Sequence, residues 1–429
     1  MARGGHSRIE DGCGAEHRKT IAAHASARLR CWTREMAQGP SNTWFNFVVT
    51  FLFREYIVNK MAGTQEQLLS LLAGRLFNVP TDVAINDALL QEARLQAVES
   101  LISKDLHSIA NNMRVIYAHT KLSDTLAEIP FTTIKGYASA YYYSQPILRT
   151  MGDVDLYVDA DHYDDAIRRF EHSGYRPVDE SHERHDTFSK DEVLFELHSE
   201  IKGIPNGKDG IKVASDTMES KVRNYLADLI PTARTVETSY GSICIPDDFH
   251  HGLIMLLHVA GHMINDGGIG LRHLCDWAVY VDRVDVEKYK TQLQDMGLWT
   301  FACQLTAVCS RYLGFRAMPW AGTWDDVFLN QLITDILNAG NFGRKEDGRS
   351  TGLALNNEGN LVSSFAEMTM HRYNFCKEKP IFLPIGMVMN SMRYLRLVAL
   401  GKKKLVSPEM ISAGAERKAL YKQFHLFEN

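Results

Sequence analysis

Residues 152–158 have the sequence GDVDLYV, an alternating pattern that predicts a strand carrying two carboxylates. Asp153 and Asp155 are separated by one apolar residue, and side chains two apart on a strand point to the same face. Both carboxylates can therefore converge on one site. A second apolar run, VLFELHSEI at 193–201, predicts another strand, and this one carries Glu196.

These carboxylates suit a hard divalent cation. Magnesium prefers oxygen ligands and usually takes one or two carboxylates together with substrate phosphates. Two such ions can stabilise both the attacking and the leaving oxygen of a phosphoryl transfer. An Asp-x-Asp pair alone is common on surface strands, so neighbouring residues are needed to indicate whether it binds metal. Glu196 lies among Leu194, Phe195 and Leu197, which predicts that its side of the strand faces a polar site or solvent.

The residues just before this strand are suited to bind phosphate. The run FTTIK at 131–135 predicts a strand, and Gly136 after it opens a predicted helix, YASAYYYS. Backbone N–H groups at such a turn can hold phosphate oxygens, with Lys135 beside them as a point charge. Ser139 is the nearest hydroxyl, and Arg149 can contact phosphate oxygens through its forked guanidinium.

The order of elements predicts an α/β unit inside a largely helical chain. Strand and helix patterns alternate between residues 131 and 201, and helical periodicity dominates on both sides. We divide the chain into an atypical N-terminal extension (1–60), a helical lead-in (61–128), an α/β domain (129–245), a helical domain (246–339), a polar linker (340–360) and C-terminal helices (361–429).

The first sixty residues lack a sustained period, whereas Met61 precedes a clean amphipathic helix. Our hypothesis is that Met61 is the true start and that residues 1–60 are upstream sequence. A genuine extension is the alternative. The apolar stretch at 44–58 is interrupted by Arg54 and Glu55 and is shorter than the roughly 20 residues that a spanning helix needs, so no membrane span is expected.

Charge and cysteine content narrow the possible partners. The chain has 429 residues and a formal net charge of −5, so no global basic field attracts nucleic acid or an anionic membrane. A small or pre-activated substrate is the simpler expectation. The seven cysteines are scattered and include no Cys-x-x-Cys pair, which favours reduced thiols in a cytoplasm over a zinc ribbon or a disulfide framework.

Several motifs in this order resemble a known family. They are IKGYASAYYY at 134–143, DVDLYV at 153–158 and FELH at 195–198, followed by LLHVAGH at 256–262 and GLRHLCDWAVYV at 270–281. This series is similar to the uncharacterised nucleotidyltransferase family of the polymerase-beta-like superfamily, found in bacterial surface-polysaccharide and peptide-natural-product gene clusters. The resemblance extends over roughly residues 65–394. It implies an α+β fold with a small mixed sheet embedded in helical segments.

The resemblance also implies an activity, which is transfer of a nucleoside monophosphate from a nucleoside triphosphate to an acceptor with release of pyrophosphate. Asp153 and Asp155 would ligate two Mg²⁺ ions, and Glu196 would be the third carboxylate, orienting or deprotonating the acceptor. Lys135 and Gly136 would hold the nucleotide phosphates. The superfamily usually has Gly-Ser or Gly-Gly at this turn, whereas Gly136 is followed here by a tyrosine.

Histidines are candidates for the acceptor side of the site. His258 and His262 have the spacing of a zinc pair on a helix, but Val259 stands where a metalloprotease has its catalytic glutamate, which argues against that class. We predict that His262 faces a cleft, together with Arg272, His273 and Asp276, and a structural role is the alternative. His198, two residues after Glu196, is predicted to hold that carboxylate or to contact substrate.

Two other functions remain open on this evidence. The fold could serve as a nucleotide-binding or regulatory module that acts through a protein partner, or as a phosphotransferase that uses the γ-phosphate. The acceptor could be a small molecule, a sugar, a lipid-linked molecule or a peptide.

Overall fold

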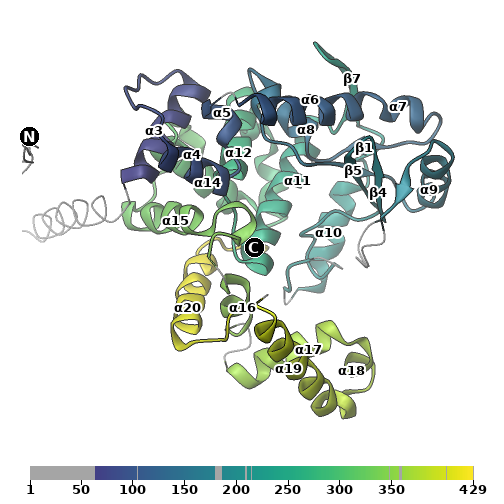
Figure 1. The fold of residues 1–429 in the computed structure, drawn as a ribbon, viewed down its shortest axis with the longest axis vertical. Coiled ribbons are helices and arrows are strands. Elements are labelled where there is room, and N and C mark those ends of the chain that lie inside the picture. The colour runs from purple at the N-terminus through teal and green to yellow at the C-terminus, as the bar shows by residue number, and fades with distance from the viewer. Residues whose placement is uncertain are drawn as a thin grey trace, which may run out of the picture. The chain divides into compact units, whose positions relative to one another are not determined.

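The computed structural model describes residues 63–103, 105–178, 186–207, 210–213, 215–346, 348–356, 360–401 and 403–428. The predicted N-terminal extension, residues 1–60, lies outside this part of the chain. The described residues combine many helices with a mixed five-stranded sheet, which confirms the predicted α+β class (Figure 1). None of the described helices is long and apolar enough to cross a membrane.

The sheet has the strand order β1-β2-β5-β4-β3. Its strands are β1 (Thr132–Thr133), β2 (Asp153–Tyr157), β3 (Arg176–Pro177), β4 (Asp186–Lys190) and β5 (Val193–His198). Only β2 and β5 are parallel, and the other pairs are antiparallel. Parallel neighbours need a crossover, which here runs through α9 (Tyr163–His172), β3 and β4. The sequence predicted α9 but not β3 and β4.

One face of the sheet packs on α9. The buried side chains of Val154, Leu156, Phe195 and Leu197 alternate with polar residues and join Phe170 of α9 in one hydrophobic core. Helix α9 ends at His172, and Gly174, two residues later, has a φ of 81° that suits the left-handed position after a helix. The opposite face of β2 and β5 is left for Asp155 and Glu196.

Helices precede and follow the sheet along the chain. The N-terminal helices are α3 (Gly63–Phe77), α4 (Asp87–Leu95), α5 (Glu99–Ser103), α6 (Leu106–Thr120) and α7 (Leu122–Thr125). After the sheet come α10 (Asp216–Leu226) and a separate hairpin of β6 (Arg234–Thr238) and β7 (Gly241–Ile245).

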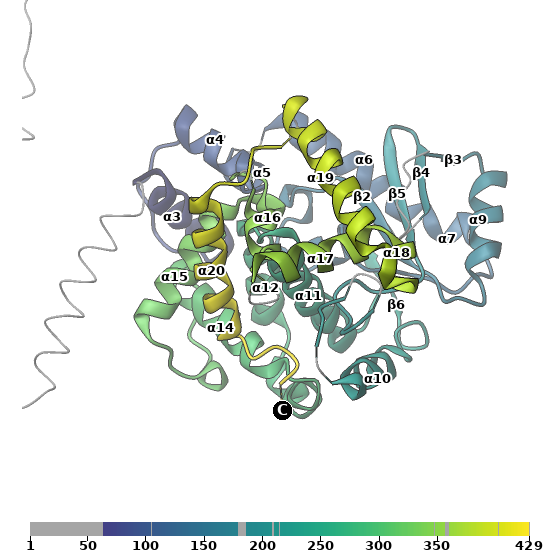
Figure 2. The same cartoon turned by 90° about the horizontal axis from the view of Figure 1, so that it is seen from below.

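A large helical core follows the hairpin. Its helices are α11 (Asp248–Gly261), α12 (Leu271–Arg283), α13 (Lys290–Asp295), α14 (Trp299–Tyr312) and α15 (Asp326–Ala339). Asp247 caps α11 by accepting a hydrogen bond from the N–H of His250. Figures 1 and 2 both show α11 and α12 between the sheet and the group formed by α3, α14 and α15.

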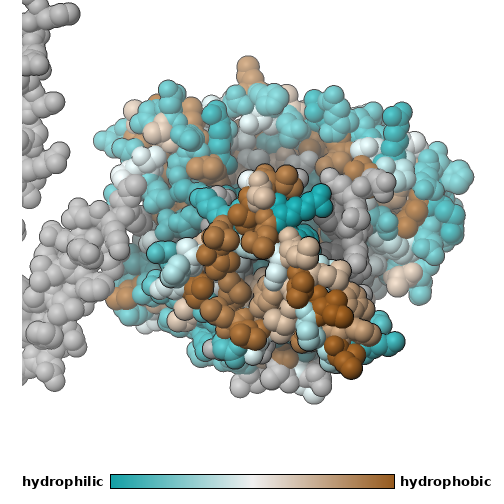
Figure 3. Space-filling view, turned by 60° about the horizontal axis from the view of Figure 1, so that its bottom comes forward, coloured by the Kyte–Doolittle hydropathy of each residue, from teal (hydrophilic) through white to brown (hydrophobic). Residues whose placement is uncertain are grey.

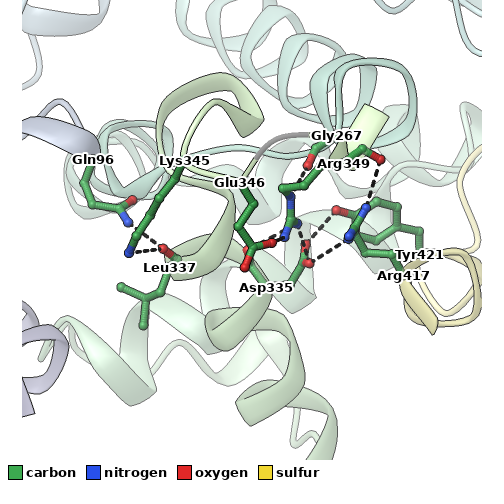
Figure 4. Close-up of polar contacts among 9 residues, drawn as sticks. All are labelled: Gln96, Gly267, Asp335, Leu337, Lys345, Glu346, Arg349, Arg417 and Tyr421. Carbon is green, nitrogen blue, oxygen red and sulfur yellow. Dashed lines mark hydrogen bonds and ion pairs between the residues drawn. The ribbon is translucent and has the colours of Figure 1, made fainter. Parts of the chain in front are cut away.

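The segment at 340–360 differs from the polar linker that its composition predicted. It contains a 3-10 turn (Asn341–Gly343) and helix α16 (Arg349–Ala354). Arg349 is buried and donates to Asp335 of α15 at 2.5 Å and to the carbonyl of Gly267 at 2.7 Å. Figure 4 shows this network, in which Tyr421 also donates to Asp335 at 2.6 Å. The segment is therefore anchored to the helical core.

The chain ends in four more helices. They are α17 (Leu361–Arg372), α18 (Asn374–Glu378), α19 (Leu383–Ala399) and α20 (Pro408–Lys422). Helix α20 packs closely against α16, where Gly414 and Gly352 face each other. Helices α17 and α19 pack mainly on each other.

Candidate active site

The parallel pairing of β2 and β5 places the acidic residues side by side. In the register of these strands Asp155 lies opposite Glu196 and Asp153 lies opposite Leu194. Asp153, Asp155, Glu196 and His198 all line the same cavity, which has a volume of about 710 Å³. Two segments about forty residues apart therefore contribute carboxylates to one end of the sheet.

Asp155 is the centre of a short polar network. Lys135 donates from Nζ to Asp155 Oδ1 at 2.7 Å, and His198 Nε2 lies 3.0 Å from the same oxygen. The second carboxylate is also close, because His198 Nε2 is 3.5 Å from Glu196 Oε2. His198 of β5 thus links Asp155 of β2 to Glu196.

The carboxylates influence one another. The charge of Asp155 raises the pKa of Asp153 to about 6, and burial and the charge of Glu196 act in the same direction. Burial alone would also raise the pKa of Asp155, but the Lys135 ammonium and the hydrogen bond from His198 hold it below its usual range. The pKa of His198 is raised by its bonds to Asp155 and Glu196, which outweigh its burial.

This donor set fits a divalent cation. Ligand atoms of Asp155, Glu196 and His198 lie within 4.8 Å of one another. The Asp153 carboxylate makes no hydrogen bond within the described residues, and the charges of Lys135 and Arg272 only partly offset the repulsion and burial that raise its pKa. Hard oxygen ligands concentrated at one point are what Mg²⁺ prefers.

The turn at Gly136 is built for close packing. Its φ is 56°, and a Cβ at this position would lie 2.8 Å from His119 Nε2 and 3.2 Å from the Asp153 carbonyl oxygen. The next residue, Tyr137, donates its N–H to His119 Nε2 at 3.3 Å. The helix that follows, α8 (Tyr137–Ala140), has a single turn, shorter than the predicted one. Its dipole is therefore weak, and Lys135 is held by Asp155.

Arg149 joins the sheet to the helical core. Its guanidinium donates to both oxygens of Asp276 on α12, at 2.9 and 2.7 Å, and the Tyr143 hydroxyl donates to Asp276 at 2.8 Å. Both charged side chains are almost fully buried. Tyr143 thus serves packing and hydrogen bonding, and Arg149 lines the cavity from a fixed position.

A histidine cluster forms the opposite wall of the cavity. His258 and His262 face each other with 3.1 Å between their Nε2 atoms, and His273 completes a group whose ligand atoms lie within 4.8 Å. Residues 262–266 form a π-helical turn, a feature frequent at functional sites. It brings Asp266 to 2.6 Å from His262 Nδ1, and Lys202 donates to the same carboxylate at 2.6 Å.

Phe342 packs on this cluster from the anchored segment at 340–356. Its ring centroid lies 4.5 Å from that of His262 and 5.1 Å from that of His273. Phe342 has a φ of 58°, which is rare for a bulky residue and is found where the surrounding structure holds strain at a site. Arg272 and Arg344 approach its ring at 5.1 and 5.6 Å.

Buried histidines give the fold a testable response to pH. Burial lowers the pKa of His119 and His251 to about 3 and that of His262 to about 4. These groups are neutral in the fold but bind protons in the unfolded chain below pH 6.5, so stability falls as pH falls from about 6.5 towards 4. We expect the melting temperature to decrease steadily over this range.

The matched variant is His251→Phe, because His251 is fully buried and both its ring nitrogens lack partners within the described residues. Its ring packs on Tyr142 at 4.8 Å between centroids, a contact that phenylalanine can keep. Thermal melts at several pH values should show a shallower decline for the variant. Parallel curves for both proteins would contradict this account.

The cavity brings together the whole predicted set. The predicted site residues that line it are Lys135, Gly136, Ser139, Arg149, Asp153, Asp155, Glu196, His198, His262, Arg272, His273 and Asp276. Sequence reasoning missed other lining residues, most of them from irregular segments, which are Lys202, Asp266, Asn341, Phe342 and Arg344. Glycines at 340 and 343 made the last segment look like a linker.

Comparison with known proteins gives one family. No curated protein matches the chain. A crystal structure of an antigenic nucleotidyltransferase-like protein from Paracoccidioides brasiliensis is similar at 14% identity and a TM-score of 0.30, covering 48% of this chain and 94% of that one. The model of the uncharacterised nucleotidyltransferase family matches residues 87–314, more than half of the chain and all of the cavity's main elements. The chain therefore belongs to the uncharacterised nucleotidyltransferase family.

Proposed function

We propose that this protein is a metal-dependent nucleotidyltransferase, which moves a nucleoside monophosphate from a nucleoside triphosphate to an acceptor and releases pyrophosphate. The observation that carries the proposal is the register of β2 and β5, which puts Asp155 beside Glu196, with Asp153 at the same cavity. The same cavity contains Arg272 and Arg344, which form no ion pair within the described residues. An acidic cluster of this kind beside such cations suits an anionic substrate bound with a divalent metal.

Asp153, Asp155 and Glu196 are the groups that would hold Mg²⁺, in the two-ion arrangement implied for the family. When bound, the metal supplies neutralisation of the charge that develops on the phosphate oxygens. Glu196 would orient the acceptor hydroxyl or accept its proton, and His198, whose Nε2 lies 3.5 Å from Glu196 Oε2, would position this carboxylate. The α-phosphorus is then attacked in line and the bond to pyrophosphate breaks.

The phosphates need positive partners besides metal. Arg272 is partly buried, and its buried Nε has no hydrogen-bond partner within the described residues. Burial and the neighbouring charge of Arg149 lower its pKa, so an anion in the cavity would stabilise its charge. Lys135, Gly136, Ser139 and Arg149 are the proposed nucleotide contacts.

The acceptor side is formed by His198, His262, Arg272 and His273. A small-molecule, sugar, lipid-linked or peptide acceptor is consistent with the family's association with surface-polysaccharide and peptide gene clusters. We place the reaction in the cytoplasm, where the nucleoside triphosphates and reduced thiols are found. The five cysteines within the described residues form no disulfide.

The test is to incubate the full chain with each of the four nucleoside triphosphates, labelled in turn on the α- and γ-phosphates, with and without Mg²⁺. Nucleotidyl transfer predicts metal-dependent release of labelled pyrophosphate and transfer of the α-label to acceptor or water. Asp161→Asn, at an exposed aspartate near the same strand, is the control that keeps activity.

The other outcomes identify the alternatives. Release of nucleoside diphosphate with transfer of the γ-label indicates a phosphotransferase. Metal-dependent binding without turnover, even with extracts that supply acceptors, indicates a nucleotide-binding module that acts through a partner. Absence of any metal-dependent binding overturns the proposed function.

A further inference from the structure

On the helices α17 to α19, many large apolar side chains are exposed to solvent. Twelve of the twenty large apolar side chains that are exposed in the described residues lie between residues 361 and 405. On α19 they are Ile385, Val388, Met389, Met392 and Leu395, with exposures from 43% to 67%. Figure 3 shows apolar side chains gathered where these helices come forward. Single exposed apolar residues are ordinary, but a continuous face of them marks an interaction site.

The inner side of the same helices is polar and small. Ser364 and Thr369 of α17 are fully buried, and Asn390 of α19 donates to the Thr369 hydroxyl at 3.2 Å. Gly386 faces Cys376 so closely that a Cβ would lie 2.3 Å from its sulfur. Small residues and side-chain hydrogen bonds between helices, with apolar residues facing outward, are typical of helices that pack in lipid.

The same segment carries strong positive charge. Residues 361–405 contain eight Lys and Arg against two Asp and Glu, a net charge of +6 in a chain whose total is −5. Arg372, Arg393 and Lys403 lie near one another, since the charge of Arg393 contributes to lowering the pKa of both others. None of the three has a carboxylate partner within the described residues.

This combination favours lipid over other occupants. A symmetric dimer through this face would bring two surfaces of charge +6 together, because a two-fold interface places the same patch on both copies. Anionic lipid supplies both an apolar layer and negative charge.

The dimensions indicate a surface position. Helix α19 has 17 residues, about 26 Å at 1.5 Å per residue, and it includes Arg393 and Arg396. That is too short and too charged to span a bilayer, but it suits a helix lying in the headgroup region.

We propose that α17 to α19 dock on an anionic lipid bilayer, with the exposed apolar side chains of α19 among the acyl chains and Arg372, Arg393 and Lys403 at the lipid phosphates. The bilayer would then hold the enzyme at a surface where lipid-linked acceptors are concentrated. The inference goes beyond the proposed function and does not depend on it, because docking needs no nucleotide.

The test is co-sedimentation of the full chain with vesicles of phosphatidylcholine alone and of phosphatidylcholine with about 30% phosphatidylglycerol. We expect binding to the anionic vesicles and release by high salt. Arg393→Gln with Lys403→Gln should weaken binding about thirtyfold, since each basic residue near the surface contributes about 1 kcal/mol. Val388→Ser with Met392→Ser should abolish it.

Leu106→Ser is the matched control, because Leu106 is 81% exposed on α6 and its loss should leave binding unchanged. Asp153→Asn should also bind normally, which separates docking from the proposed chemistry. The inference is overturned if the anionic vesicles do not bind the protein, or if the α19 variants bind as well as the native chain. It is also overturned if ultracentrifugation shows a dimer that the α19 variants dissociate.

Discussion

Asp153→Asn is expected to abolish metal-dependent turnover and, at the same time, to make the metal-free protein more stable. Both effects are expected because Asp153 lies beside Asp155 and Glu196 and makes no hydrogen bond within the described residues. An amide at this position removes a ligand and also removes a like-charge repulsion.

The expected loss of activity is roughly a thousandfold or more, because metal binding supplies several kcal/mol of charge stabilisation in phosphoryl transfer. The gain in stability follows from the carboxyl pKa. A shift from 3.8 to about 6 corresponds to a penalty of roughly 3 kcal/mol at neutral pH. The penalty is full above pH 6 and disappears as the pH falls towards 4.

Thermal melts with a chelator and with Mg²⁺ measure both effects. With the chelator, the melting temperature of the variant should be a few degrees above that of the native protein at pH 7.5. Near pH 4 the two melting temperatures should be the same. With Mg²⁺ only the native protein should gain stability. A variant that melts below the native protein at every pH would show that Asp153 has an attractive role that the geometry does not reveal.

Asp276→Ala is expected to have the largest effect on folding. It removes the partner of a buried guanidinium and of the Tyr143 hydroxyl, and Arg149 has only 7% of its side chain exposed. Loss of one member of a buried ion pair costs about 3–5 kcal/mol, because an uncompensated charge remains inside. Urea denaturation should show a midpoint lowered accordingly.

Two matched variants interpret the result. Arg149→Met combined with Asp276→Leu should cost less than Asp276→Ala, because no charge is left buried. Asp285→Ala removes an exposed ion pair with Lys288, whose side chains are 56% and 71% exposed, and should change stability by less than about 1 kcal/mol. If Asp276→Ala lowered stability no more than Asp285→Ala, the Arg149 guanidinium would have to be hydrated in the variant, and the expectation of an uncompensated buried charge would be wrong.

The strands that carry the carboxylates were predictable from local sequence, whereas parts of the sheet were not. Alternation of polar and apolar residues identified β2 and β5. The hairpin of β4 and β5 was missed because its turn, Asp191 and Glu192, has two positive φ values without the glycine that usually announces them. Register between strands is also set by tertiary packing, so the pairing of Asp155 with Glu196 was not predictable.

The histidine cluster on α11 and α12 was also only partly predictable from local sequence. Periodicity predicted α11 and α12 and therefore their histidines, but no local pattern indicates that Asp266 turns back onto His262 or that His119 accepts from the Tyr137 N–H. In α19 the apolar residues could be recognised in the sequence. Their helical spacing shows that they share one face, but it does not show whether that face is buried or exposed. The usual assumption that apolar residues lie inside is wrong for this helix.

The parallel pairing of β2 and β5 also has a kinetic consequence. A hairpin closes after a few residues, but Asp155 meets Glu196 only when the whole crossover through α9, β3 and β4 has been ordered. Long-range contacts form late because the entropy of loop closure must be overcome first. A chain emerging during synthesis therefore has no assembled carboxylate site until most of the sheet is in place, and its three acidic groups spend that period apart and fully hydrated.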